Sequence, residues 1–105
     1  MNILFVCSRN KGRSATAETI YKNHPVHQVR SAGTEPSARI KINAKLISCA
    51  DLIFVMEKKH KQRIAERFPE EIYEKEIITL NIPDDYQYMD ETLIKELNAK
   101  VTDYL

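Results

Sequence analysis

The sequence contains no tryptophan, only two glycines and four prolines, and no long hydrophobic run. No stretch approaches the ~20 apolar residues that a membrane-spanning helix needs. No low-complexity linker or internal repeat divides the chain, so we expect one domain over residues 1–105. Neither sign of charge is in excess, because 16 Lys and Arg residues stand against 15 Asp and Glu residues. This balance indicates neither a nucleic-acid partner nor a membrane partner.

Cysteine is scarce as well, since Cys7 and Cys49 are the only two. Two cysteines are too few for a disulfide framework, and they leave no second pair for a zinc site. We expect both to be free thiols in a reducing compartment. The apolar start of the chain has no basic leader and is typical of a strand rather than a secretory signal, so we expect a cytoplasmic location.

The three histidines, His24, His27 and His60, have no spacing typical of a metal site. Each is interpreted as a surface histidine or a hydrogen-bonded one. The sequence therefore predicts no metal and no other cofactor.

What the sequence has is an alternation of strand and helix patterns. Residues 2–7 and 51–56 are nearly unbroken apolar runs with Ile and Val, which is typical of strands buried on both faces of a parallel sheet. The predicted strands are residues 2–7, 26–32, 51–56 and 76–80, and the predicted helices are residues 13–23, 36–48, 58–68 and 91–105.

This alternation favours an α/β fold in which right-handed crossovers place helices on both faces of a parallel sheet. In such sheets ligands bind beyond the carboxyl ends of the strands, where the chain order reverses. We therefore expect a functional site where the first strand ends, at Cys7.

The segment that follows this strand, CSRNKGRS, places the Cys7 thiol, five loop residues and Arg13 around a helix N-terminus. Backbone N–H groups of such a loop can converge on one point, and the helix dipole reinforces their field. The pattern predicts a phosphate-binding loop after the first strand. Its predicted substrate-binding residues are Ser8, Arg9, Asn10, Lys11, Gly12 and Ser14.

Cys7 is the predicted nucleophile of this loop. Cysteines near cations at helix N-termini ionise readily, so we expect a thiolate at neutral pH. Arg13 can hold two phosphate oxygens with its planar guanidinium, and the Ser14 hydroxyl can donate a hydrogen bond to the sulfur. The plainer alternative is a buried cysteine at a strand end and an arginine on the first turn of a helix.

A phosphocysteine route also needs an acid for the leaving oxygen and a base for water. Asp84 and Asp85 follow the fourth predicted strand and so lie at the same sheet edge as Cys7, with Pro83 stiffening the approach. We predict Asp84 as the general acid, with Asp85 as the second choice. The alternative is that Pro-Asp-Asp is only turn chemistry.

Together these residues resemble the low-molecular-weight protein tyrosine phosphatase family, whose signature is a strand ending in Val-Cys, five residues, and Arg-Ser. Here it runs from Val6-Cys7 to Arg13-Ser14. Residues 31–34 and 50–57 are similar to further family segments, so the resemblance spans nearly the whole chain.

The resemblance implies a four-stranded parallel sheet in the order 2-1-3-4, flanked by helices. It implies hydrolysis of phosphate monoesters, above all phosphotyrosine, through a phosphocysteine on Cys7. Asn10 corresponds to the asparagine that holds the loop backbone, and Pro83-Asp84 to the general-acid element. The implied substrate is a phosphorylated protein or a small phosphate ester.

The chain also departs from the family pattern. Gly12 stands where many members carry a second cysteine, and Lys11 replaces an apolar loop residue. Residues 35–48 are much shorter than the family segment that supplies an aromatic wall for the substrate ring. Tyr86 and Tyr88 could supply that stacking surface instead, and the alternative is that they are only core or rim residues.

Two other functions fit the residues less well. A thiol-dependent arsenate reductase on the same fold needs resolving cysteines near the C-terminus, and none follows Cys49. A non-catalytic phosphate- or oxyanion-binding module would keep the loop without turnover. Turnover of a simple phosphate ester separates this module from an enzyme.

Overall fold

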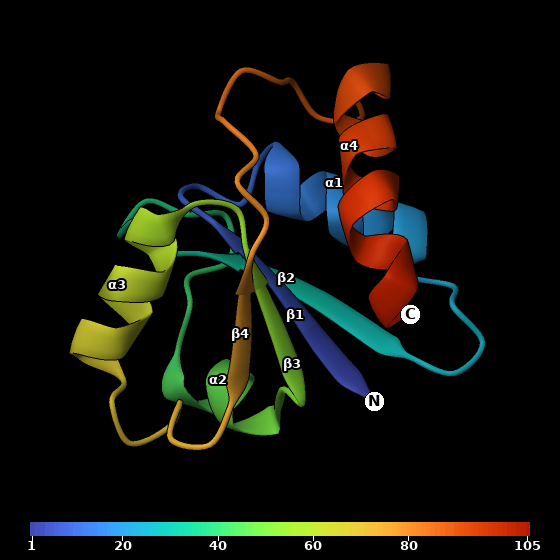
Figure 1. Ribbon diagram of the computed structural model, residues 1–105. Helices are drawn as coiled ribbons and strands as arrows, with labels where there is room; N and C mark the ends of the chain where they lie inside the picture. Colours follow the sequence, from blue (N-terminus) through green and yellow to red (C-terminus); the bar gives the residue numbers. More distant parts are fainter.

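The computed structural model describes all 105 residues and shows strands and helices in strict alternation (Figure 1). In chain order the elements are β1 (Asn2–Cys7), α1 (Arg13–Tyr21), β2 (Gln28–Gly33), α2 (Ala44–Cys49), β3 (Leu52–Val55), α3 (Lys58–Arg67), β4 (Glu76–Thr79), α4 (Glu91–Val101) and a 3-10 turn (Thr102–Tyr104). None of the helices is both long and apolar enough to cross a membrane.

The four strands form one parallel sheet in the order β2-β1-β3-β4. In register, Cys7 of β1 lies beside Gly33 of β2, and Val55 of β3 lies beside Thr79 of β4. The carboxyl ends of all four strands therefore meet at one edge of the sheet. The predicted α/β fold with the strand order 2-1-3-4 is confirmed.

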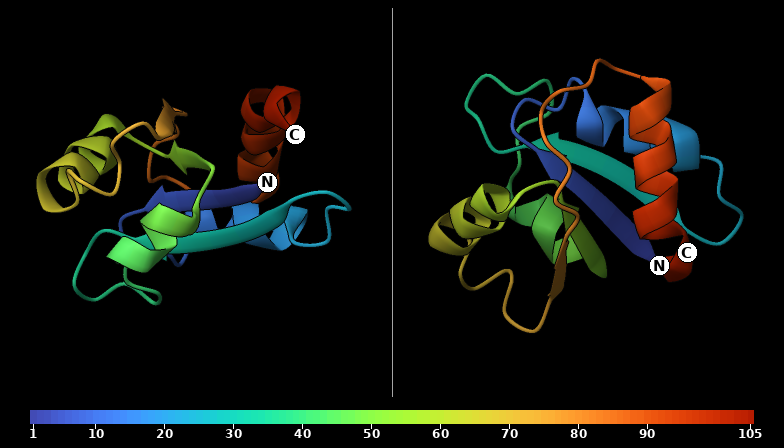
Figure 2. Two further views of the ribbon diagram at one scale, coloured as in Figure 1. Left: turned by 90° about the horizontal axis from the view of Figure 1, so that it is seen from below. Right: turned by 45° about the horizontal axis from the view of Figure 1, so that its top comes forward.

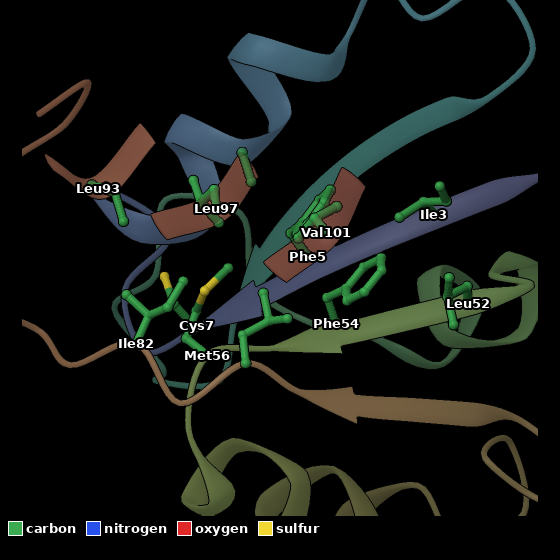
Figure 3. Close-up of a cluster of buried hydrophobic side chains, with 12 residues drawn as sticks. Ile3, Phe5, Cys7, Leu52, Phe54, Met56, Ile82, Leu93, Leu97 and Val101 are labelled. Atoms are coloured by element: carbon green, nitrogen blue, oxygen red, sulfur yellow. The ribbon is translucent and has the colours of Figure 1, made fainter. Parts of the chain in front are cut away.

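Helices cover both faces of the sheet, as predicted, because side chains alternate between faces along each strand. On one face, Phe5 and Phe54 stack at a centroid distance of 5.1 Å and pack with Leu97 of α4 (Figure 3). On the other face, Val6 packs with Ile64 of α3. Accordingly, α3 and α4 lie on opposite sides of the molecule in both views of Figure 2.

The predicted helix over residues 36–48 is wrong in its first half, because α2 begins only at Ala44. The preceding chain is held by Gly33 instead: Gly33 N–H donates to Ile40 O, and Ile42 N–H donates to Gly33 O. Asn43 then caps α2 by accepting from Leu46 N–H at 2.9 Å. Tertiary hydrogen bonds thus replace the first helical turns that the apolar spacing predicted.

Several other boundaries differ from the prediction by one to four residues. The second strand begins at Gln28 rather than Val26, whose side chain is exposed. The last helix ends at Val101 and tightens into a 3-10 turn, which is common at helix ends.

Gly33 is required where β2 passes the loop after β1. A Cβ atom at this position would lie 2.5 Å from Ser8 O and 2.6 Å from Ala38 Cβ. We expect Gly33→Ala to destabilise the protein by about 1–3 kcal/mol, because the loop backbone must move. Thermal unfolding measures this, with Ser37→Ala in the exposed neighbouring segment as the control. An unchanged midpoint for Gly33→Ala would contradict the close approach.

Candidate active site

The loop between β1 and α1 wraps around the Cys7 side chain. Asn10 has a left-handed backbone (φ 59°), which asparagine tolerates better than most residues. The loop is tied to the next segment because Thr34 N–H donates to Cys7 O and Glu35 N–H donates to Ser8 O, both at 2.9 Å. Its curvature is therefore fixed from outside as well as by its own sequence.

Polar groups reach the Cys7 sulfur from two sides. The Asn10 backbone N–H donates to Sγ at 3.2 Å, and Ser14 Oγ lies 2.9 Å from Sγ. Asn10 Nδ2 donates to Ser14 Oγ at 2.8 Å, so the serine proton is available to the sulfur or, at the longer distance of 3.4 Å, to Ala32 O. Cys7 is 3% exposed, beside Met56 and Ile82 at one end of the hydrophobic cluster (Figure 3). The sulfur thus has an apolar floor and polar neighbours on the loop side.

The Arg13 side chain is buried and anchored at one nitrogen. Its Nη1 donates to Glu57 Oε2 at 2.5 Å and to Ile82 O at 2.8 Å. Its Nε makes no hydrogen bond, although Asp84 Oδ1 lies 3.7 Å away. Burial alone raises the pKa of Glu57, but the hydrogen bond and charge of Arg13 outweigh it, so this pKa lies below its usual value. Glu57 is therefore a carboxylate at neutral pH.

His60 is a fully buried contact of the loop that our sequence interpretation did not connect with the site. The Glu57 backbone N–H donates to its Nδ1 at 3.0 Å, and its Nε2 lies 2.9 Å from Ser8 Oγ. Burial and the charge of Arg13 lower the pKa of His60 to about 4. The ring is consequently neutral at pH 7, with its proton on Nε2, and it donates to Ser8 Oγ.

The segment between β4 and α4 lies over the loop, where the two cross near the top of Figure 1. Lys100 of α4 holds its start by donating to Leu80 O at 2.8 Å. Its far end is held by α1, because Met89 N–H donates to Thr16 Oγ1 at 2.8 Å. Contacts with both helices of one layer thereby fix the segment that carries Asp84.

The loop and the overlying segment enclose a cleft of about 290 Å³. Its lining residues are Cys7, Ser8, Arg9, Lys11, Gly12, Arg13, Asp84, Tyr86, Gln87 and Tyr88. The structure therefore brings the predicted nucleophile, arginine and acid to one cleft, with both predicted tyrosines. No three His, Cys, Asp or Glu side chains are grouped so that they could hold a metal ion.

Three of the candidate residues do not line this cleft. Asn10 and Ser14 are fully buried and support the loop from behind, in contact with each other and with the sulfur. Asp85 is exposed and absent from the lining, whereas its neighbour Asp84 is present.

Desolvation and the nearby charges of Glu96 and Asp85 raise the pKa of Tyr86, so its hydroxyl stays protonated.

The sequence carried a signal for the missed pair of Glu57 and His60. Glu57 is the N-cap of α3, and His60 stands at the third helical position, where the two form a reciprocal capping box. An acidic residue followed three positions later by a hydrogen-bonding side chain, directly after a strand, is typical of such a helix start. The pattern does not show that Glu57 also bonds Arg13 or that His60 also bonds Ser8.

No protein-family model matches the chain, and no curated protein matches it in sequence. Solved structures do match. The tyrosine phosphatase Wzb from Escherichia coli K30, in complex with phosphate, superposes with a TM-score of 0.79 at 23% identity, covering 98% of this chain and 94% of that one. A low molecular weight protein tyrosine phosphatase from T. tengcongensis gives 0.76 at 22% identity, covering 100% and 99%.

A third match is the YwlE arginine phosphatase from Geobacillus stearothermophilus, with a TM-score of 0.65 at 25% identity and coverage of 98% and 94%. These likenesses run over nearly the full length of each chain. The protein therefore has the fold of the low-molecular-weight protein tyrosine phosphatases, as the sequence resemblance predicted.

The neutral His60 makes stability depend on pH. Its pKa in the fold, about 4, lies below its ordinary 6.5, so its contribution is complete above pH 6.5 and is lost as the pH falls toward 4. We expect the free energy of unfolding to fall from pH 6.5 to about 5 more steeply in the wild type than in His60→Gln. Urea unfolding at several pH values measures both.

His24 and His27 are present in both proteins and cancel in this comparison. Glu57 does not contribute in the same window, because its lowered pKa places its own loss of stability below pH 4.5. Parallel pH profiles for the wild type and His60→Gln would contradict a neutral, buried His60.

Proposed function

We propose that this protein hydrolyses phosphate monoesters, with phosphotyrosine as the substrate, through a covalent phosphocysteine on Cys7. The observation that carries the proposal is the meeting of three groups in one cleft. The Cys7 sulfur, contacted by the Asn10 N–H and the Ser14 hydroxyl, lines the cleft with the Arg13 guanidinium and with Asp84, whose Oδ1 lies 3.7 Å from Arg13 Nε. These are a nucleophile, an anion-binding cation and a proton donor.

In the first step the Cys7 thiolate attacks phosphorus in line with the leaving oxygen. The S–P bond forms as the P–O bond to the leaving group breaks, and Asp84 donates its proton to that oxygen. The free Nε of Arg13 and the loop N–H groups hold the phosphoryl oxygens, whose charge they stabilise as phosphorus becomes five-coordinate. The Glu57 and Ile82 contacts keep the guanidinium in place during this change.

In the second step Asp84, now a carboxylate, takes a proton from water while the water oxygen attacks phosphorus. The S–P bond breaks, inorganic phosphate leaves, and the electron pair returns to sulfur. The Ser14 hydroxyl, 2.9 Å away, stabilises the departing thiolate. The cycle closes with Asp84 protonated and Cys7 ionised, and it consumes only water.

Phosphotyrosine is favoured by the aromatic side chains at the cleft. Tyr86 and Tyr88 line it and offer stacking surface to a phenyl ring. The Wzb and T. tengcongensis structures are those of tyrosine phosphatases, and the Geobacillus structure is that of an arginine phosphatase. Phosphoarginine is therefore the comparison substrate that tests this choice.

The position of Cys49 disfavours an arsenate reductase that would use it to resolve Cys7. Asn2 Nδ2 donates to Cys49 O at 3.1 Å, which places Cys49 at the amino end of β1. Cys7 is five residues further along the strand, or about 16 Å at ~3.3 Å per residue. A disulfide needs Cα atoms less than about 7 Å apart.

Turnover of para-nitrophenyl phosphate without added metal tests the proposal. We expect the wild type to hydrolyse it, vanadate to inhibit, and Cys7→Ser to abolish turnover while oxyanion binding is retained. Binding of vanadate measured by calorimetry gives the second readout. A correctly folded wild type that binds vanadate and never turns over would leave the binding module as the function.

The effect of the leaving group on the rate tests which aspartate is the general acid. We expect Asp84→Ala to lower kcat by about 10²–10⁴-fold for phenyl phosphate, because phenolate is a poor leaving group that needs a proton. The loss should be much smaller for para-nitrophenyl phosphate, because para-nitrophenolate leaves without protonation. Asp85→Ala is the matched control, because its side chain lies outside the cleft. Equal losses on both substrates would indicate a structural role, and a loss confined to Asp85→Ala would transfer the role to Asp85.

A further inference from the structure

A second groove, of about 490 Å³, opens beside the catalytic cleft. It is lined by Lys11, Ala15, Glu18, Thr19, Lys22, Arg39 and Tyr88. Lys11 and Tyr88 line both hollows, so the groove begins where the cleft ends. A ligand chain that enters the cleft can therefore continue into it without a break.

The groove follows one face of α1. Ala15, Glu18 and Lys22 are spaced three and four residues apart, which places them in a row along the helix. At ~1.5 Å per residue, the row runs about 10 Å from Ala15 to Lys22. An extended peptide covers that length with about three residues. The groove is thus long enough for several residues on one side of a phosphorylated one.

Its charge is positive, because three cations line it with one carboxylate. That carboxylate is already engaged: Glu18 Oε1 accepts from Ser31 Oγ at 2.7 Å and lies 3.5 Å from Arg39 Nη2. Lys11 and Lys22 are exposed and form no salt bridge with any side chain of the protein. Two unpaired cations therefore face the groove at its two ends.

Arg39 provides a fixed wall between them. Its backbone N–H donates to Arg9 O and its side-chain Nε donates to Asn10 O, both at 3.0 Å. The residue belongs to the short segment after β2, the part of the chain that replaces the longer aromatic-bearing segment of the family. A cation that is anchored to the catalytic loop loses little further freedom on binding.

We propose that this groove binds acidic residues that flank the phosphorylated residue of a protein substrate. The proposal rests on the proposed function and adds its substrate class: an acidic phosphopeptide rather than a small ester. The chain as a whole carries a net charge of only +1, so the attraction is local to the groove. A small ester fills the cleft and leaves the groove untouched, whereas an acidic peptide pairs with Lys11, Lys22 and Arg39.

The test compares two phosphotyrosine peptides that differ only in their flanks, one with Asp and Glu and one with Asn and Gln. We expect kcat/KM to be about 3- to 10-fold higher for the acidic peptide, the range for one to three partly exposed ion pairs. Raising the salt to about 0.5 M should remove most of this preference. Affinities of Cys7→Ser for both peptides provide the same comparison without turnover.

Substitutions of Lys22, to Glu and to Gln, test whether the preference for the acidic peptide arises in the groove. Lys22 is exposed, lies outside the catalytic cleft and contacts no reacting group, so we expect turnover of para-nitrophenyl phosphate to be unchanged. The preference for the acidic peptide should shrink in Lys22→Gln and vanish in Lys22→Glu. Lys61→Glu, an exposed substitution on α3, changes the net charge equally and serves as the matched control.

The outcomes separate the two proposals. Absence of para-nitrophenyl phosphate turnover by the wild type overturns the proposed function, and the Cys7→Ser affinities then still test the groove. Turnover with equal kcat/KM and equal affinities for the two peptides overturns only the proposal that the groove binds acidic residues. An equal loss of preference in Lys61→Glu and Lys22→Glu would assign the effect to net charge and overturn the groove as well.

Discussion

The site depends on how the Arg13 guanidinium is held. One nitrogen of this buried side chain bonds both the Glu57 carboxylate and the Ile82 carbonyl, so the start of α1 is joined to the residues that follow β3 and β4. Removing Glu57 would leave the charge of the buried Arg13 uncompensated and out of water, which is costly. The pair therefore keeps three strand ends in register around one cation. Because Nη1 carries both contacts, Nε remains directed toward the cleft and Asp84.

A neutral histidine completes this arrangement without adding charge. His60 accepts the Glu57 N–H on Nδ1 and donates to Ser8 Oγ from Nε2. The start of α3 therefore holds both ends of the loop after β1, because His60 bonds Ser8 near its start and Glu57 bonds Arg13 at its end. A protonated ring would place a second buried cation next to Arg13. The low pKa of His60, about 4, prevents this at neutral pH and leaves Arg13 as the buried cation beside Cys7.

The sequence was sufficient to predict features that depend on short stretches of neighbouring residues. Apolar runs identified the strands, and the spacing from Cys7 to Arg13 between a strand and a helix identified the loop. Features that depend on tertiary contacts were not predictable from it. The start of α2 was misplaced because Gly33 withdraws residues 40–42 into hydrogen bonds with β2. His60 was missed as a loop contact because its neighbours are charged and exposed, a pattern that indicates a solvated helix. The sequence favoured Asp84 over Asp85 only through the resemblance of Pro83-Asp84 to a family element, and the path of the overlying segment puts Asp84 but not Asp85 in the cleft lining.

The segment after β2 bears on recognition through its contact with the loop. Residues 34–43 contain no aromatic side chain, and Arg39 Nε donates to Asn10 O of the loop. The aromatic surface comes instead from the segment before α4, where Tyr88 is fixed to α1 by a 2.7 Å hydrogen bond with Thr19. Tyr88 lines both the cleft and the cationic groove, so the aromatic and the cationic surfaces adjoin each other. Ring stacking is largely insensitive to flanking sequence, whereas ion pairs are not. Under the two proposals, selection among phosphorylated partners falls to the cations of the groove, and catalysis to the adjoining cleft.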